Sequence, residues 1–328
     1  MRVAVTGGGG FVGGAVVRQL LARGDEVVAL VRDPARWTGP ERPGLTLVAD
    51  DLRDPSSIAA SLEGADALIH GAGSYRIGIA ASERPAMHDA NVGTARRTVD
   101  AALASHVPRI VYVSTVNVFG DTGGTVVDET YRRDPAAGFL SWYDETKWRA
   151  HVEVEERIEK GAPAMIVMPS QVYGPGDHTP IGDQLAQAFA GALPFVGLGG
   201  VGLGFVHVED LGRGILAALD RGVVGRSYVL GGDTVRIRDA LRIAAKAGGH
   251  RLPRLEIPDL PLRIGAFLFP NRGAWFGLSP NLREIVSASI GVTYWATSAR
   301  AATELGFDPR PLAVGLPAVL AETAGRTA

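Results

Sequence analysis

The chain has 328 residues, of which 46% are hydrophobic and 21% charged, a balance typical of a folded globular protein and not of a disordered or fibrous one. Its 33 Lys and Arg nearly balance its 35 Asp and Glu, so charge favours neither nucleic acid nor an anionic membrane as a partner. The absence of cysteine excludes disulfides, thiolate metal sites and cysteine nucleophiles. No stretch reaches the roughly 18 continuous apolar residues of a membrane span, and the N-terminal apolar run is too short for a signal peptide. We therefore expect a soluble, cytoplasmic protein.

The first half of the chain alternates short β-branched runs with helical patterns. Runs of Val, Ile and Leu without polar alternation indicate strands buried on both faces, which predicts a doubly wound α/β fold around a parallel sheet. The clearest predicted helices cover 11–22, which Gly24 can end, and 86–105. The predicted strands are 3–5, 26–31, 45–49, 67–70, 109–114 and 164–168.

A glycine loop follows the first predicted strand and opens the first helix. Its spacing is Gly7-x-x-Gly10-x-x-Gly13. Such a loop provides a tight turn, lets backbone approach phosphate oxygens, and leaves the N–H groups of the helix N-terminus free to bind a pyrophosphate. A plain glycine-rich hairpin is the alternative, since the chain holds 43 glycines. The strand before the loop and the helix after it favour a dinucleotide site.

Tyr143 and Lys147 are four residues apart, so on a helix they lie on one face. A phenol with a pKa of about 10 exchanges protons poorly near neutrality, and a nearby ammonium can stabilise its anion. We therefore expect a lowered pKa for Tyr143 and general acid–base catalysis by it. Thr115, just past a predicted strand, can hold the reacting oxygen beside the phenol. The alternative is an ordinary surface Tyr and Lys on an amphipathic helix.

The segment from Thr6 to Gly13 resembles the TGxxGxxG signature of the extended short-chain dehydrogenase/reductases, within the NAD(P)-dependent epimerase/dehydratase superfamily. Further segments match this family, in its order, along nearly the whole chain. They are Asp51-Leu52, His70-Gly71-Ala72, Asn91-Val92-Gly93-Thr94, Ser114-Thr115, Val118-Phe119-Gly120, Tyr143-x-x-x-Lys147, Pro169-x-x-Val172-Tyr173, His207-Val208-x-Asp210 and Glu304-Leu305-Gly306-Phe307. Within the family, the chain looks most similar to the dihydroflavonol 4-reductase and hydroxysteroid dehydrogenase branch.

The resemblance implies roles for individual residues. Tyr143 exchanges the proton with the carbonyl or carbinol oxygen, Lys147 lowers its pKa and binds the nicotinamide ribose, and Thr115 holds the substrate oxygen where serine is commoner. Asn91 supports the site from behind. Hydride passes to or from the nicotinamide, so the coenzyme carries the chemistry. The implied coenzyme-binding residues are Gly7, Gly10, Phe11, Val12, Gly13, Asp51, Leu52, Gly71, Ala72, Gly73, Asn91, Tyr143, Lys147, Pro169 and Val172.

The composition changes in the second half of the chain, which has a glycine cluster at 197–204 and a stretch rich in proline and aromatic residues at 252–280. We predict a dinucleotide-binding Rossmann domain over 1–172, to which a segment at about 205–232 returns. The remaining segments, 173–204 and 233–328, form a smaller substrate-binding domain. The family resemblance also implies a homodimer built from two helices of each subunit, around 86–105 and 143–160.

The end of the second strand predicts which coenzyme is bound. NAD-binding members place an acidic residue there, whereas this chain has Val31 followed by Arg32 and Asp33. Arg32 can pair with a 2′-phosphate, and Arg36 can assist. We therefore predict NADP(H), with NAD(H) as the alternative if Asp33 turns inward to the ribose.

Local differences separate the reactions known for this scaffold. Dehydratases resembling this family carry Asp-Glu directly after the catalytic threonine, where this chain has Val116 and Asn117. Nucleotide-sugar epimerases often place an arginine at the position of Leu203 and an asparagine at that of Gln171. Arginines elsewhere leave the epimerase open as the alternative to a reductase. A catalytically silent coenzyme-binding sensor is the third possibility, although Tyr143 and Lys147 are both intact.

Aromatic side chains near the expected mouth of the site favour a small lipophilic or aromatic carbonyl substrate. Each of them alone is more typical of core packing. We predict no metal site, because no His, Asp or Glu cluster has metal-ligand spacing. The predicted substrate contacts are Tyr75, Asn117, Trp142, Gln171, Tyr173 and Phe205, with Trp275 and Phe276 as further aromatics. The sequence thus predicts NADPH-dependent reduction of a ketone or aldehyde.

Overall fold

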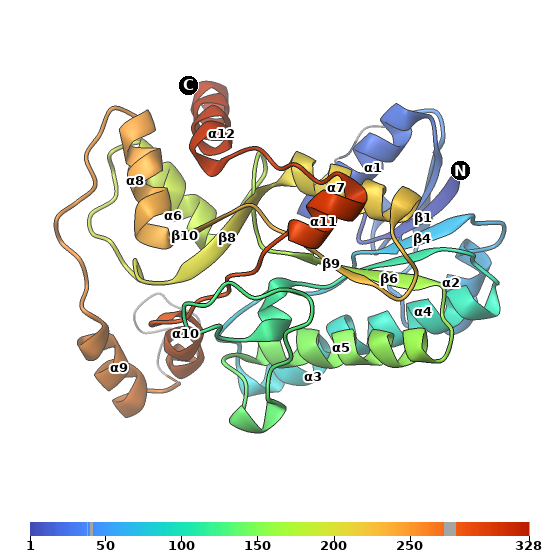
Figure 1. Ribbon diagram of the computed structural model, residues 1–328, viewed down its shortest axis with the longest axis horizontal. Helices are drawn as coiled ribbons and strands as arrows, with labels where there is room; N and C mark the ends of the chain where they lie inside the picture. Colours follow the sequence, from blue (N-terminus) through green and yellow to red (C-terminus); the bar gives the residue numbers. More distant parts are fainter. Residues whose placement is uncertain (38, 40–41, 272–279, 328) are drawn as a thin grey trace.

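The computed structural model describes residues 1–37, 39, 42–271 and 280–327. Its centre is a seven-stranded parallel sheet in the order β3-β2-β1-β4-β5-β6-β9, with helices on both faces (Figure 1). This confirms the predicted doubly wound α/β fold. The strands of this sheet are β1 (Arg2–Thr6), β2 (Glu26–Val31), β3 (Leu45–Ala49), β4 (Ala67–His70), β5 (Ile110–Val113), β6 (Ala164–Pro169) and β9 (Ser227–Leu230).

Two hydrophobic cores flank this sheet, because its central strands are apolar on both faces. One core lies under α1 and α7, with Leu20 and Ile215 fully buried. The other lies under α2, α4 and α5, with Ile58 and Val154 fully buried. The helices are α1 (Phe11–Arg23), α2 (Pro55–Ser61), α3 (Arg84–His88), α4 (Thr94–Ala104), α5 (Trp142–Glu159), α6 (Pro180–Phe189), α7 (Val208–Arg221), α8 (Ile237–Ala247), α9 (Asp259–Leu268), α10 (Leu282–Ser289), α11 (Ala299–Leu305) and α12 (Leu312–Thr327).

The helix predicted over 86–105 is present, but it is not α-helical throughout. It comprises α3 and α4, joined by a π-helical turn over Asp89–Gly93. The first helix ends as predicted, because Gly24 adopts the left-handed conformation (φ 88°) and its N–H bonds back to the last turn. Single π-helical turns are frequent at functional sites, and this one contains Asn91.

A smaller sheet stands beside the large one, with α6 and α8 around it at the left of Figure 1. Its order is β10-β8-β7, in which β7 (Gln171–Tyr173) runs parallel and β10 (Asp233–Arg236) antiparallel to β8 (Gly202–His207). It packs with α6, α8 and α12 around a third core. After β8, α7 packs on the large sheet and β9 pairs with β6.

The structure departs from the predicted division at α11. Ala301 and Leu305 of this helix are fully buried in the core under α1 and α7, where α11 contacts α7 and β9. This helix therefore packs with the large sheet, although the sequence placed it in the smaller domain. Within the described ranges, no helix is both long and apolar enough to cross a membrane.

Candidate active site

The carboxyl ends of the parallel strands meet at one edge of the sheet, where β1 and β4 mark the reversal of strand order. The loop after β1 has room only for glycine at two positions. A Cβ on Gly7, whose φ is 73°, would lie 2.8 Å from the Ala72 nitrogen in the loop after β4. A Cβ on Gly13 would lie 2.1 Å from the Gly7 carbonyl oxygen. The loop is therefore pressed against its own helix and against the next strand.

This loop fits a dinucleotide. α1 begins after Gly10 without a side-chain cap and without an acidic residue in its first turn. Its first N–H groups thus have no carboxylate or hydroxyl competing for them, and the helix dipole favours an anion there. On the other side, the ring of Phe11 lies 4.0 Å from where a Cβ on Gly176 would stand, so the turn after β7 comes close to the loop. Pro169 is buried and Val172 half-buried in this region.

The loop after β2 presents Arg32 and Arg36 as exposed side chains. Between them, the Asp33 carboxylate accepts a hydrogen bond from the Ala35 N–H (3.0 Å) and so caps the short helix that follows. Among the described residues, neither arginine has an ion-pair partner. The two guanidinium groups are therefore available to an anionic ligand at this strand end.

At the end of β3, the backbone is stabilised by Asp50, a residue that the sequence analysis did not select. Buried Asp50 accepts a hydrogen bond from the Leu52 N–H (2.7 Å). Leu52 has a φ of 62° and is itself buried, so Asp50 stabilises a backbone turn that is unfavourable for leucine. The predicted contact residue Asp51 is exposed beside this turn.

Thr115, Tyr143 and Lys147 come together as buried side chains, each 8% exposed. Thr115 follows β5, and the other two lie in the first turns of α5. The Tyr143 ring packs edge-on against the Tyr75 ring, with centroids 4.7 Å apart. The Lys147 ammonium donates to the Val113 carbonyl oxygen (3.1 Å) at the end of β5. The predicted triad is therefore one cluster between β5 and α5.

The predicted lowering of the Tyr143 pKa is not what the structure shows. Burial raises the pKa of this phenol far above its ordinary value, Tyr75 and Asp144 raise it further, and the nearby Thr115 hydroxyl lowers it. Burial likewise lowers the pKa of Lys147 to about 8. The ammonium of Lys147 is directed to the Val113 carbonyl and stands over the Tyr112 ring at 5.3 Å. Tyr143 is consequently held neutral, as a proton donor.

Asn91 links the loop after β4 to α5. Its Oδ1 accepts from the Ser74 N–H (2.7 Å), and its Nδ2 donates to the Ser74 carbonyl (3.1 Å) and to the Thr146 hydroxyl (2.9 Å). All its hydrogen-bonding groups are thus engaged by two segments that border the cluster. A Cβ on Gly73 would lie 3.0 Å from Asn91 Oδ1, so glycine there keeps the loop close.

The structure adds two residues to the cluster that the sequence did not indicate. Asp144 has no exposed surface, and burial raises its pKa to about 6. It accepts hydrogen bonds from Asn117 Nδ2 (3.1 Å) and from the Tyr294 hydroxyl (3.3 Å). The Ser141-x-x-Asp144 pattern of a helix start could have pointed to the carboxylate. Nothing in the sequence pointed to Tyr294, which lies 150 residues further along the chain.

The predicted substrate contacts divide into two groups. Tyr75 is 48% exposed against Tyr143, and Trp142 begins α5 beside it, with its indole N–H donating to the Arg84 carbonyl (3.1 Å). Tyr173 and Phe205, by contrast, are buried in the core of the smaller sheet. These two predictions are corrected here, because a side chain enclosed by its own core has no surface to offer a substrate.

The structure gives less information on the other residues predicted to contact the substrate. Gln171 is half-buried and donates to the Val172 carbonyl (3.2 Å). Trp275 and Phe276 lie outside the described residues. Within the described part of the chain, no group of three His, Asp or Glu side chains is arranged to hold a metal ion.

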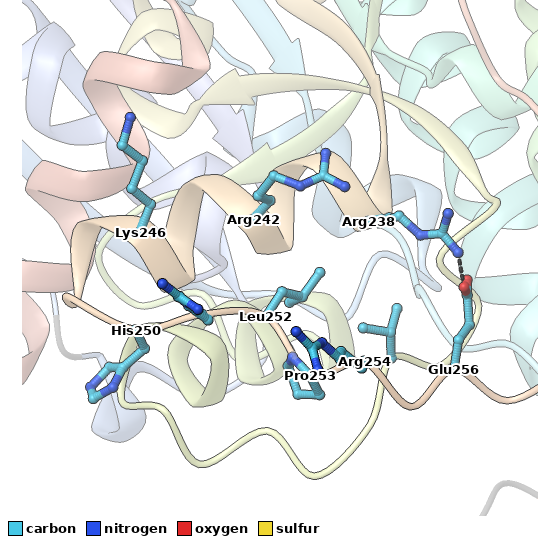
Figure 2. A pocket seen from close by; sticks show the side chains of 10 residues that line it. Arg238, Arg242, Lys246, His250, Leu252, Pro253, Arg254 and Glu256 are labelled. Carbon is cyan, nitrogen blue, oxygen red and sulfur yellow. Dashed lines mark ion pairs between the residues drawn. The ribbon is translucent and has the colours of Figure 1, made fainter.

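A separate hollow of about 470 Å³ lies on α8 and the segment after it. Figure 2 shows Arg238, Arg242 and Lys246 along α8, with His250 and Arg254 on the following segment. It contains none of the residues predicted for the site, so we do not assign it to the Tyr143 cluster.

Three comparisons with known proteins cover most of the chain. The model of the NAD dependent epimerase/dehydratase family matches residues 3–231. A Synechocystis protein named "Putative dihydroflavonol 4-reductase" is 31% identical over 312 residues, 92% of this chain and 88% of that protein. Sterol demethylase protein B of Methylococcus capsulatus is 28% identical over 319 residues, 94% of each chain. The crystal structure of gox2253 has 32% identity and a TM-score of 0.83, covering 99% of this chain and 98% of that one.

Proposed function

Because the chain belongs to the NAD dependent epimerase/dehydratase family, we propose that it is an NADPH-dependent oxidoreductase that reduces the carbonyl group of a small lipophilic or aromatic substrate. One observation carries the proposal: a neutral, buried phenol at Tyr143 lies in one cluster with Thr115 and Lys147 at the edge of the sheet that holds the glycine loop.

The bound coenzyme supplies the hydride, and the chain supplies the binding, the orientation and the proton. Tyr143 donates its proton to the substrate oxygen as that oxygen gains negative charge. The Thr115 hydroxyl, which donates to Asn117 (3.1 Å), turns its proton to the same oxygen when the substrate binds. Lys147, fixed by the Val113 carbonyl, places a positive charge beside the site. Asn91 keeps the loop after β4 in place against α5, which preserves the distance between coenzyme and phenol.

Two features support a lipophilic or aromatic substrate. Tyr75 packs on Tyr143 and leaves about half its surface exposed, so a bound molecule would meet an aromatic wall. The names of two relatives, a dihydroflavonol reductase and a sterol demethylase component, refer to ring systems of this kind.

NADP(H) is our proposed coenzyme, although Asp33 could serve the ribose hydroxyls of NAD(H), because one of its oxygens already accepts from the Ala35 N–H and two arginines stand beside it. Arg32 and Arg36 are both exposed at the same loop and carry the charge that a 2′-phosphate needs. NAD(H) remains the alternative coenzyme. By the same family resemblance, we also propose a homodimer.

The second candidate is a nucleotide-sugar epimerase, which the family membership favours equally. Leu203 stands where such enzymes often have an arginine, and Gln171 stands where they have an asparagine. Both features leave a sugar nucleotide without its usual partners, so reduction is the better supported reaction.

A panel assay separates the candidates. The purified chain is mixed with NADPH or NADH and with acetophenone, benzaldehyde, 2-octanone or octanal, and coenzyme oxidation is followed at 340 nm. We expect turnover with at least one aromatic carbonyl and tighter binding of NADPH than of NADH. No turnover with any carbonyl, together with epimerisation of UDP-glucose, selects the second candidate.

A further inference from the structure

Asp144 is a fully buried carboxylate directly after Tyr143, in the first turn of α5. Its Oδ1 accepts from Asn117 Nδ2 at 3.1 Å and its Oδ2 from the Tyr294 hydroxyl at 3.3 Å. Its own N–H is capped by the Ser141 hydroxyl (3.0 Å). A carboxyl taken out of water destabilises the fold unless it is well paired, and such groups concentrate at functional sites.

The carboxylate determines which way the neighbouring groups donate. An ionised carboxylate only accepts hydrogen bonds, so the NH₂ group of Asn117 must face Asp144. The Asn117 oxygen then faces Thr115, whose hydroxyl donates to it (3.1 Å). The Thr115 oxygen in turn accepts from the Asn117 backbone N–H (3.3 Å). A single sequence of donors therefore runs from Thr115 through Asn117 to Asp144.

We propose that Asp144 is a positioning residue that, through the side-chain amide of Asn117, orients the Thr115 hydroxyl beside Tyr143. The proposal rests on the function proposed for the Tyr143 cluster. Asp144 does not touch the reacting atoms. It acts by excluding the alternative orientation of the Asn117 amide, in which the NH₂ group faces Thr115 and the amide oxygen faces Asp144.

The pKa of Asp144 gives a check on folding. Burial raises it from 3.8 to about 6, while Asn117, Ser141, Arg133 and Tyr294 lower it. The groups around the carboxyl are the phenols of Tyr75, Tyr143 and Tyr294 and the Arg133 guanidinium. Between pH 3.8 and 6 the folded state binds more protons than the unfolded state, so stability falls as pH rises and the loss is complete above about 6. Asp144→Asn should therefore melt higher than wild type at pH 7, by a margin that vanishes near pH 4.

Kinetics test the positioning role. With the best carbonyl of the panel, Asp144→Asn should lower kcat roughly 10- to 100-fold, the range for a lost hydrogen bond to a charged group, and leave the KM for NADPH unchanged. In a Thr115→Val background the same substitution should change kcat less than about 2-fold, because the hydroxyl that it positions is absent. Glu145→Gln is the matched control, since it removes a carboxylate from the same helical turn that pairs with Arg149 (2.6 Å), and it should keep full activity. Equal losses in both backgrounds, or full activity of Asp144→Asn, overturn the proposal.

A second readout does not depend on turnover. The side-chain amide resonances of Asn117, identified by their loss in Asn117→Ala, should shift with a midpoint near pH 6 in wild type and be independent of pH in Asp144→Asn. Resonances that ignore both pH and the substitution contradict the hydrogen-bond sequence. A wild-type chain that reduces no carbonyl contradicts the proposed function instead, so the two failures are distinguishable.

Discussion

The glycine loop and the Tyr143 cluster serve one edge of the sheet but are held by different forces. In the loop, backbone packs on backbone: a Cβ on Gly13 would lie 2.1 Å from the Gly7 carbonyl oxygen. In the cluster, side chains from four separate segments hydrogen-bond to one another, as Asp144 does with Asn117 and Tyr294. The loop should therefore tolerate no added atom at Gly7 or Gly13, whereas the cluster should tolerate a change of shape and be sensitive to the loss of a donor or an acceptor.

The largest expected effect is in the cluster. Tyr143→Phe removes the proton donor and keeps the ring that packs on Tyr75, so turnover should fall roughly 10²–10⁴-fold while NADPH affinity stays within a few-fold. Steady-state kinetics and fluorescence titration with NADPH measure the two quantities. A variant with wild-type turnover would show that another group donates the proton.

The loop should respond to one added methyl group. Gly13→Ala should destabilise the fold by about 3 kcal/mol or more, because the Gly7 backbone must move to admit the Cβ. Gly14→Ala, on the same helix, is the matched control: its Cβ would meet nothing closer than 3.6 Å, and alanine favours the helix by up to ~1 kcal/mol. Urea unfolding of both variants measures the difference. Similar stabilities for the two would mean that the loop is not closely packed.

The preference for NADPH over NADH is predicted to depend on a third place, the loop after β2. Arg32→Gln removes one charge from the loop after β2, so NADPH affinity should fall about 10- to 150-fold, the equivalent of a charge-assisted hydrogen bond of ~1.5–3 kcal/mol, while NADH affinity changes little. Arg96→Gln, exposed on α4, controls for the loss of a surface charge. If NADPH and NADH affinities fall together, Arg32 does not read the 2′-phosphate.

The smallest effect separates shape from hydrogen bonding in the cluster. Thr115→Ser keeps the hydroxyl that donates to Asn117 (3.1 Å) and removes only a methyl group. Turnover should stay within about 3-fold of wild type, a barrier change under ~1 kcal/mol. A loss as large as that of Tyr143→Phe would assign the methyl group, and not the hydroxyl, the main role.

The parts that could be predicted are those in which neighbouring residues determine the outcome. The strands at 26–31 and 67–70 have the predicted bounds, because an apolar run that is buried on both faces depends little on its partner strand. The edge strand at 45–49 also has the predicted bounds, although it is only partly buried. The family resemblance, inferred from the glycine loop and the Tyr143–Lys147 spacing, is confirmed by the family match.

The wrong or missing predictions concern long-range burial. Tyr173 and Phe205 looked like substrate contacts, but an aromatic residue in a core has the same local sequence signature as one at the mouth of a site. The low pKa expected for Tyr143 considered only the ammonium one turn away, whereas burial by the whole surrounding structure determines its direction. The π-helical turn at Asp89–Gly93 likewise has no distinct periodicity in the sequence.

The sequence by itself determined the parallel sheet, the glycine loop and the placing of Tyr143 and Lys147 in the first turns of one helix, because each depends on residues a few positions apart. Only the tertiary structure decided that Asp144, Asn117 and Tyr294 meet beside that tyrosine, and that its phenol stays protonated. The physical reason is that a hydrogen bond between residues 27 or 150 positions apart, and the removal of a group from water, exist only once the chain has folded around them.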